Sequence, residues 1–419
     1  MERNVGRGLT RTAWIALGIG MLLRLAMALA VPIDPISDQA AYETYATNIL
    51  DHGVYGLAPD QPGAYWAVGT AALAAAAFYL TGGSFVGILV LNLIAGFAMM
   101  VLVYQVARDW FGQRPAELSV ILVALWPNLI LFTSTLSSEP YFIALFLGGL
   151  RAWQLRGRGI AWLLLAGLLW GLACYVRPVA LLVPVALIFA ALPKGIGAVL
   201  RAVGQAAVML AVILAVLSPW TLRNYRVFGE FVLVSTNFGP NFWMGNNPDS
   251  DGGYMPLPER VSGLSEIERA KMLQDEAKAY VAENPGRFAV NTLTKAVRLH
   301  ERETIGVVWT QAGLERIGGT GLVVVMKLLA TGYWYLLLGL AFIGIAALRR
   351  HGSVLFHPLV ISWGYFTAIH AIIVMGDRYH MPAAGVIAIL AALGAHSLHQ
   401  RLRPEDRPPN PTQERTLAG

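Results

Sequence analysis

The first candidate for chemistry is a carboxylate on a short predicted helix, Asp38 in SDQAAYETYATNIL. Asp38, Tyr42 and Tyr45 follow at i, i+4 and i+7, so they share one face of a helix that begins after Ser37. A carboxylate placed there could act as a general base that takes the proton of a hydroxyl group. In the alternative interpretation, Asp38 is an ordinary solvated charge in an acidic loop.

Three arginines near predicted helix ends form the second group. Arg177 precedes a proline in YVRPVA, Arg223 lies in PWTLRNYRVFG, and Arg378 lies in GDRYHMP. Arginine suits phosphate because its planar guanidinium can donate two parallel hydrogen bonds. The three side chains could therefore meet at one anionic group. Alternatively, Arg177 reaches lipid headgroups and Arg378 pairs with the neighbouring Asp377.

Two more charged residues lie at or inside apolar runs. Glu139 starts a helix in TSTLSSEPYF, where it could be a helix-dipole partner or a member of the site. Arg24 lies inside the first apolar run, and it either extends to the membrane surface or binds the same phosphate. The eight histidines are scattered, without metal-ligand spacing on a predicted outer helix. No cofactor is expected, although carboxylates leave a divalent metal open.

Membrane helices must position these residues. Of the 419 residues, 56% are hydrophobic and only 13% are charged, whereas a soluble domain carries about 25% charged residues. This composition excludes a soluble or disordered chain, and the single Cys174 excludes an intrachain disulfide. The net charge of +6 fits basic cytoplasmic loops and does not point to nucleic acid.

The fold class predicted is an all-α polytopic membrane protein with about ten transmembrane helices. The expected spans are 12–31, 84–107, 116–133, 140–154, 160–176, 178–192, 199–218, 320–347, 355–375 and 380–398. The run 63–81 is assigned to an outer-face helix, because counting it as a span would place the basic loop RDWFGQR outside. Both termini are then cytoplasmic. The first run is expected to stay as an uncleaved anchor.

The charge pattern divides the chain into four parts. They are an N-terminal transmembrane catalytic module, 1–218, with its first outer loop at 32–83; a periplasmic loop region, 219–319; C-terminal transmembrane helices, 320–400; and a disordered cytoplasmic tail, 401–419. The large loop should be mixed α/β. Its FVLVSTN stretch predicts a strand, and Ser265 with Glu268 predicts a helix that starts with a capping box and ends at Asn284–Pro285.

Outward-facing acids and arginines at a membrane surface favour an enzyme that uses a lipid phosphate. The alternative is a transporter or flippase of a lipid-linked sugar. Such a protein would be expected to contain two repeated halves and charged groups near the bilayer midplane. Arg24 is the main charge well inside a span, and no repeat is found. The residues thus favour the enzyme without deciding its reaction.

The motifs, taken in order, resemble the GT-C superfamily of polytopic glycosyltransferases, in its family-39-like branch. This branch is related to protein O-mannosyltransferases, the lipid A aminoarabinose transferase and the rhizobial lipid A galacturonosyltransferases. The stretches that carry the resemblance are DQAAYETYATNILDHGVYG (38–56), ARDWFGQRPAELSVILVALWPNLILFTSTLSSEPYF (107–142), GLLWGLACYVRPVALLVP (167–184), SPWTLRNYRVFGEFVLVSTNFGPNFWMGNNP (218–248) and GDRYHMPAAGVIAIL (376–390).

The resemblance implies an inverting transfer of one sugar from a polyprenyl-phosphate donor to a hydroxyl of a lipid, glycan or protein acceptor. Asp38 matches the presumed base, and Arg177, Arg223 and Arg378 match arginines suited to the donor phosphate. Further substrate contacts are predicted at Tyr42, Glu139, Asn224, Asn246 and Tyr379. The expected location is the bacterial inner membrane, with the active site on its periplasmic face.

Two positions depart from the family pattern. Relatives often carry a basic residue before a Pro-Pro pair in the first loop, where this chain has Gln61 and a single Pro62. They also commonly carry a second acid after the first-loop aspartate, where this chain has Gln39. Any phosphate, metal or acceptor role of those two family residues must fall elsewhere here.

Overall fold

The computed structural model describes residues 8–402, and within that range the chain is helical, with one isolated bridge between Ala58 and Gln61. The α-helices are α1 Arg11–Ala30, α2 Asp38–His52, α3 Val68–Thr81, α4 Val86–Phe111, α5 Gln113–Ala124, α6 Pro127–Leu131, α7 Glu139–Gln154, α8 Ile160–Val176, α9 Val183–Ala186, α10 Ile196–Phe228, α11 Phe238–Gly245, α12 Glu266–Glu283, α13 Pro285–Arg298, α14 Ile305–Trp309, α15 Gln311–Ala347, α16 Pro358–Ile373 and α17 Ala384–Leu402. Short 3₁₀ helices are η1 Phe132–Ser134, η2 Arg156–Arg158, η3 Pro178–Ala180, η4 Leu187–Lys194, η5 Glu259–Val261, η6 Leu348–His351 and η7 Met381–Ala383.

The chain is a multi-pass membrane protein. In the described part, five helices are long and apolar enough to span a membrane, namely α1, α4, α10, α15 and the stretch Met381–Leu402. The pair Gln113–Ala124 and Pro127–Ser134, bent by 57°, would make a sixth. Helices occupy all ten expected spans, but several are short. The number of crossings, about ten, therefore stays a prediction.

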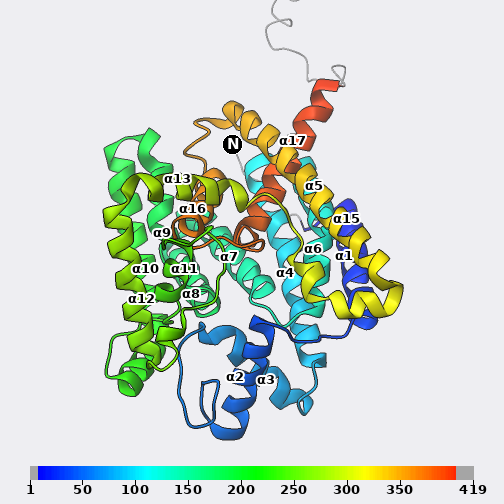
Figure 1. Ribbon diagram of the computed structural model, residues 1–419. Helices are drawn as coiled ribbons and strands as arrows, with labels where there is room; N and C mark the ends of the chain where they lie inside the picture. The colour runs from blue at the N-terminus through cyan, green and yellow to red at the C-terminus, as the bar shows by residue number, and fades with distance from the viewer. Residues whose placement is uncertain (1–7, 403–419) are drawn as a thin grey trace, which may run out of the picture.

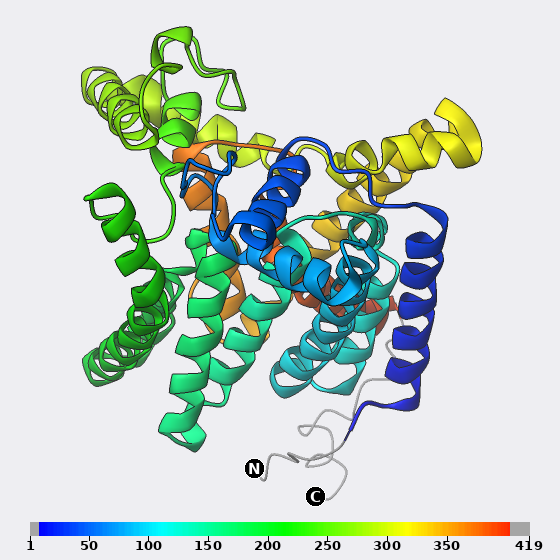
Figure 2. The ribbon, with the colours of Figure 1, turned by 90° about the horizontal axis from the view of Figure 1, so that it is seen from below.

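The helices form a bundle, and the helices of residues 32–83 and 219–319 that are not expected to span the membrane gather toward one end of it. Figure 1 shows α10 on one side and α1 and α15 on the opposite side, with α7 between them. In Figure 2, α2, α12 and α13 gather at one end of the molecule, and α7 and α8 run away from them. Residues from both outer regions can therefore meet over the helix ends.

Helices α15 and α17 pack with their backbones in direct contact. A Cβ atom added at Gly344 would lie 1.9 Å from the carbonyl oxygen of Leu390, and one added at Gly394 would lie 1.9 Å from that of Leu340. These glycines let the two backbones touch, as small residues do in membrane helix packing. The first eleven residues of α17, 384–394, are all buried, so this end of the helix provides a fixed support for the segment before it.

Arg24 has neither of its two expected roles. Its side chain is 1% exposed and donates to the carbonyl oxygens of Val123 (3.0 Å) and Ala124 (3.3 Å), and to that of Gly20 in its own helix. Val123 and Ala124 end α5, where a bend leaves carbonyls without helical partners. Arg24 therefore stabilises the broken helix and does not extend to the membrane surface or toward a phosphate.

The expected strand in FVLVSTN is wrong, since no residue of 231–237 is assigned to a strand and bends and a turn interrupt the segment. Side chains of α10 replace a partner strand: Asn224 Nδ2 donates to the Val232 carbonyl, Thr221 Oγ1 to that of Leu233, and Trp220 Nε1 to that of Val234. The segment then crosses to the first outer loop, where Thr236 N donates to the Ala64 carbonyl. In residues 219–319 the large outer region is thus helices and irregular chain, not mixed α/β.

The two other local predictions in this region, the capped start of one helix and the residues at which it ends, are confirmed. The capping box is present at the start of α12, with Ser265 and Glu268 making both reciprocal hydrogen bonds. Asn284 ends α12 and Pro285 begins α13. A break inside α15 falls at Gly318 and Gly319, where Gly319 has φ +65°. Of the expected disordered tail, 403–419 lies outside the described residues.

Candidate active site

Four charged side chains from distant parts of the chain meet at one end of the helical bundle. Arg378 Nη2 donates to Asp38 Oδ2, and Arg378 Nη1 lies 3.6 Å from Glu139 Oε1. Arg177 Nη1 donates to the same Glu139 oxygen at 2.8 Å. The Glu139 side chain is fully buried, whereas that of Asp38 is 22% exposed. The cluster thus presents one accessible carboxylate and two cations held by a buried acid.

Each member of the cluster lies at a helix end, which explains how the fold positions it. Asp38 and Glu139 are the first residues of α2 and α7, where a negative charge is favoured by the helix dipole. Arg177 is the C-cap of α8, and Pro178 prevents that helix from continuing. Arg378 lies between α16 and η7, just before the buried α17.

Aromatic rings confine the two arginines. The guanidinium carbon of Arg378 lies 4.5 Å from the centroid of the Trp309 ring and 5.6 Å from that of Tyr379, which also lies 5.6 Å from Arg177. Tyr379 in turn stacks on His370 with centroids 4.7 Å apart. These cation–π contacts hold the guanidinium planes in place while leaving donor groups available.

Tyr42 lies one helical turn after Asp38 and has a buried phenol. Burial raises the pKa of Tyr42 above its ordinary value, and the negative charge of Asp38 acts in the same direction. The phenol therefore remains protonated at neutral pH and can only share or donate its hydrogen. Such a group can hold a hydroxyl or phosphate oxygen near Asp38 but does not compete with Asp38 as a base.

The cluster opens into a cavity of about 1830 Å³ with two kinds of wall. Asp38, Tyr42, Arg177, Arg378 and Tyr379 all line it. Apolar side chains of α8, η3 and α16 and the residues beside them form one wall: Val176, Pro178, Val179, Leu181, Leu182, Tyr365 and Ile369. Polar and charged residues of the first loop and of α12 and its cap, among them Asp60, Gln61, Glu266 and Glu268, also line it. The cavity thus combines apolar side chains, the charged cluster and further polar groups.

The cavity lining also includes residues that no sequence motif marks. Arg269 lines the cavity, and its guanidinium makes no hydrogen bond or ion pair with any residue of 8–402. Burial raises the pKa of the neighbouring Tyr65 to about 12, against the opposing effect of the Arg269 charge. Glu266 is bound by Ala64 N and Thr236 Oγ1. These residues carry no motif, and only the fold brings them to Asp38.

Arg223 is not part of the cluster that Arg177 and Arg378 form at Glu139. It donates to the carbonyl oxygens of Gly63 (2.7 Å) and Tyr55 (3.3 Å) and lies over the Trp220 ring at 4.7 Å. It therefore fastens α10 to the first outer loop. Neighbouring Asn224 is fully buried and does not line the cavity, but it holds the 232–234 segment, of which Leu233 and Val234 do line it.

Asn246 is also placed away from the cavity. Its amide donates to the carbonyls of Ile372 and Ile373, both at 3.0 Å, and its oxygen accepts from Lys295 Nζ at 3.1 Å. Burial lowers the pKa of Lys295 to about 8. Asn246 and Lys295 thus join α11 and α13 to the end of α16, and the structure gives Asn246 no direct path to a substrate.

We expect Arg223→Ala to reduce stability more than substrate binding. The change removes two charge-assisted hydrogen bonds to backbone carbonyls, each worth about 1–3 kcal/mol. The thermal midpoint in detergent should fall, while the KM for the donor should stay near the wild-type value at a temperature where the variant is folded. A raised donor KM with an unchanged midpoint would instead restore Arg223 to the phosphate site.

Within residues 8–402, no three His, Cys, Asp or Glu side chains gather in a way that could hold a metal ion. Glu139 and Asp38 both bind arginine, and their carboxylates converge on Arg378.

Residues 62–222 match the family described as dolichyl-phosphate-mannose-protein mannosyltransferase. No curated protein matches the chain in sequence. Two similar solved structures are from Archaeoglobus fulgidus. One, an oligosaccharyltransferase in complex with zinc and sulfate, is 15% identical with a TM-score of 0.56 and covers 94% of this chain and 49% of that one. The other, the oligosaccharyltransferase AglB with an inhibitory peptide and a dolichol-phosphate, is 15% identical with a TM-score of 0.53 and covers 96% and 52%.

ArnT of Cupriavidus metallidurans, bound to undecaprenyl phosphate, is 13% identical with a TM-score of 0.44 over 96% of this chain and 82% of that one. The chain spans about half the length of the archaeal oligosaccharyltransferases that it matches. The helical architecture over nearly the whole chain and the match over 62–222 confirm the resemblance drawn from the motifs. The chain has the GT-C fold.

Proposed function

We propose that this chain is an inverting glycosyltransferase that moves a single hexose or pentose from a polyprenyl-phosphate donor to a hydroxyl of a lipid, glycan or protein acceptor. The observation that carries the proposal is the position of Asp38 beside Arg378 and Arg177, in a cavity with one apolar wall. Support comes from the shared fold with AglB, whose structure contains a dolichol-phosphate. Its expected place is the inner membrane of a bacterium, with the cavity on the periplasmic side and both termini in the cytoplasm.

The apolar wall and the two arginines would each bind a different part of the donor. Leu181, Leu182 and Ile369 offer a surface for the polyprenyl chain near the membrane. Arg177 and Arg378 provide guanidinium groups for the phosphate at the edge of that surface. This arrangement leaves the sugar in the polar half of the cavity, between Asp38 and the outer segments.

The transfer can then be written with Asp38 as the base. The acceptor oxygen attacks the anomeric carbon from the side opposite the phosphate and forms the new C–O bond. The bond between the anomeric carbon and the phosphate oxygen breaks, and its electron pair leaves with the polyprenyl phosphate. The acceptor proton passes to an oxygen of Asp38. Attack from the opposite side inverts the anomeric centre.

The arginines stabilise charge that develops on the leaving phosphate. Arg378 pairs with Asp38 and Glu139, so its positive charge is already in place. A phosphate would attract Arg378 and Arg177 while Glu139 holds both from behind. Preorganised cations of this kind lower the barrier because they need no reorientation as the bond breaks.

The proposal is tested with purified protein in proteoliposomes and a panel of polyprenyl-phosphate hexoses and pentoses. We expect release of polyprenyl phosphate together with a mass gain of one sugar on a lipid, glycan or protein acceptor, measured by mass spectrometry with and without EDTA. Movement of the labelled donor across the vesicle without a new glycosidic bond would overturn the proposal and indicate a transporter or flippase.

A further inference from the structure

The segment that carries Arg378 is attached on both sides to a second segment, 299–304, which links α13 to α14. Before Arg378, Asp377 accepts hydrogen bonds from Thr304 N (2.9 and 3.0 Å to its two oxygens) and from Thr304 Oγ1 (2.5 Å). After it, His380 Nδ1 lies 3.0 Å from the Leu299 carbonyl oxygen. Arg378 is therefore held between two anchored neighbours.

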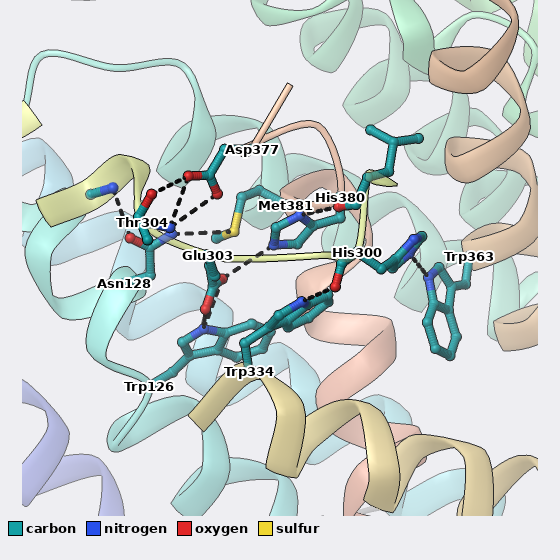
Figure 3. A network of polar contacts seen from close by, with 12 residues as sticks. Trp126, Asn128, His300, Glu303, Thr304, Trp334, Trp363, Asp377, His380 and Met381 are labelled. Atoms are coloured by element: carbon teal, nitrogen blue, oxygen red, sulfur yellow. Dashed lines mark hydrogen bonds and ion pairs between the residues drawn. The ribbon is translucent and has the colours of Figure 1, made fainter. Parts of the chain in front are cut away.

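Glu303 completes the attachment from inside the protein (Figure 3). Its side chain is fully buried, and Trp126 Nε1 donates to its two oxygens at 2.8 and 3.0 Å. Oε1 lies 3.3 Å from Nε2 of His380. Among residues 8–402 no arginine or lysine pairs with this carboxyl group, which is buried against the imidazole of His380, the indole of Trp126 and the amide of Asn128.

The donors and acceptors in this group fix where the protons can be. A carbonyl oxygen only accepts, so His380 Nδ1 carries a hydrogen and points it at Leu299. The indole of Trp126 only donates, so Glu303 accepts there. One hydrogen remains between Glu303 Oε1 and His380 Nε2, and burial raises the pKa of Glu303 well above its ordinary value. A protonated Glu303 that donates to a neutral His380 satisfies every atom of the group.

The surrounding aromatic residues keep this pair dry. The Trp334 ring stacks on His380 with centroids 4.2 Å apart, and its Nε1 donates to the His300 carbonyl at 2.9 Å. Trp363 Nε1 donates to His300 Nε2, also at 2.9 Å. The network extends from Trp363 to Asp377, and of its members only Asp377 lines the cavity. An ionised Glu303 would therefore have no water to solvate its charge.

We propose that Glu303 is a protonated positioning residue which donates a hydrogen bond to His380 and thereby fixes Arg378 against Asp38 and Glu139. Nothing in Glu303 touches the cavity, so it acts on catalysis through the 376–381 segment. The inference rests on the proposed function, because its effect is read as a loss of sugar transfer. It assigns a role to a buried acid for which the sequence shows no motif.

Three substitutions at Glu303 distinguish a role as a hydrogen-bond donor from a role as a negative charge. The amide of Glu303→Gln can donate to His380 Nε2 while its oxygen accepts from Trp126, so we expect this variant to retain most of the activity. Glu303→Ala and the better-filling Glu303→Met leave both partners unsatisfied. Their kcat should fall by up to about 10²-fold through displacement of Arg378. Glu301→Gln, on the same segment but with a 62% exposed side chain, is the matched control and should behave as wild type.

A second measurement does not depend on activity. The infrared spectrum of the wild type should contain a carbonyl stretch from a buried carboxylic acid, and Glu303→Gln should lack it. An absent band, or an inactive but folded Glu303→Gln, would show that the carboxylate charge matters and would overturn the proposal.

The outcomes distinguish this inference from the proposed function. If Glu303→Met transfers sugar as fast as the wild type while Asp38→Asn is inactive, the positioning role fails and the glycosyltransferase stands. If Asp38→Asn is fully active, the proposed base fails, whatever Glu303 does. Because Met fills the space of Glu closely, a folded variant is expected even if the alanine variant cannot be purified.

Discussion

The Asp38→Asn variant is expected to lose sugar transfer, with kcat falling on the order of 10²–10⁴-fold, the usual effect of removing a general base. Asparagine has nearly the shape of aspartate and can still accept the hydrogen bond from Arg378 through its amide oxygen. It cannot take up the acceptor proton. Donor binding should therefore change little, and the loss should appear in kcat, measured with the donor and acceptor identified in the proteoliposome assay.

Asp34→Asn is the matched control, since Asp34 is an exposed acid four residues earlier in the same loop. It should be as active as the wild type. Asp38→Glu tests geometry, because it keeps the basicity but moves the carboxylate by one methylene, and partial activity is expected. A folded Asp38→Asn that turns over at the wild-type rate would show that Asp38 only holds Arg378.

Local patterns predicted the helices well because each depends on a continuous stretch of chain. Apolar length placed the helices of all ten expected spans, and the spacing of Ser265 and Glu268 gave the start of α12. The strand in FVLVSTN was wrong because β-propensity does not say whether a partner strand exists. Here side chains of α10, Asn224 among them, satisfy the carbonyls of that segment.

The site was predictable in its residue types but not in its grouping. Arg177 and Arg378 lie together at Glu139, yet Arg223, with an equally suggestive motif, binds backbone carbonyls of the first outer loop. An arginine serves a buried carbonyl as readily as a phosphate, and only the fold distinguishes the two uses. Arg24 shows the same ambiguity inside the membrane.

The buried network behind Arg378 lay beyond the reach of local patterns. Trp126 and Glu303 are 177 residues apart in sequence, and Glu303 and His380 are 77 apart. Glu303 stands in the polar stretch HERET, where an exposed acid is the natural expectation. Its burial follows from the packing of Trp126, Asn128 and His380 around it, which no spacing rule describes.

Arg378→Ala is expected to be the second most damaging change, with kcat/KM for the donor reduced on the order of 10²–10³-fold. The variant loses the cation that faces Asp38 and leaves Glu139 with Arg177 alone. Arg378→Lys restores the charge, but one ammonium cannot copy a planar fork that reaches Asp38 through one nitrogen and Glu139 through the other. Its activity should therefore lie between those of the wild type and the alanine variant.

The control is Arg302→Ala, which removes an exposed arginine from the outer segment close to Arg378 in the fold. It should leave the kinetics unchanged. Monodisperse elution and a measured thermal midpoint establish that each variant is folded. Donor binding, followed by titration with undecaprenyl phosphate alone, then separates two roles. Weaker binding in Arg378→Ala supports contact with the phosphate, whereas unchanged binding with a lowered kcat would restrict Arg378 to orienting Asp38.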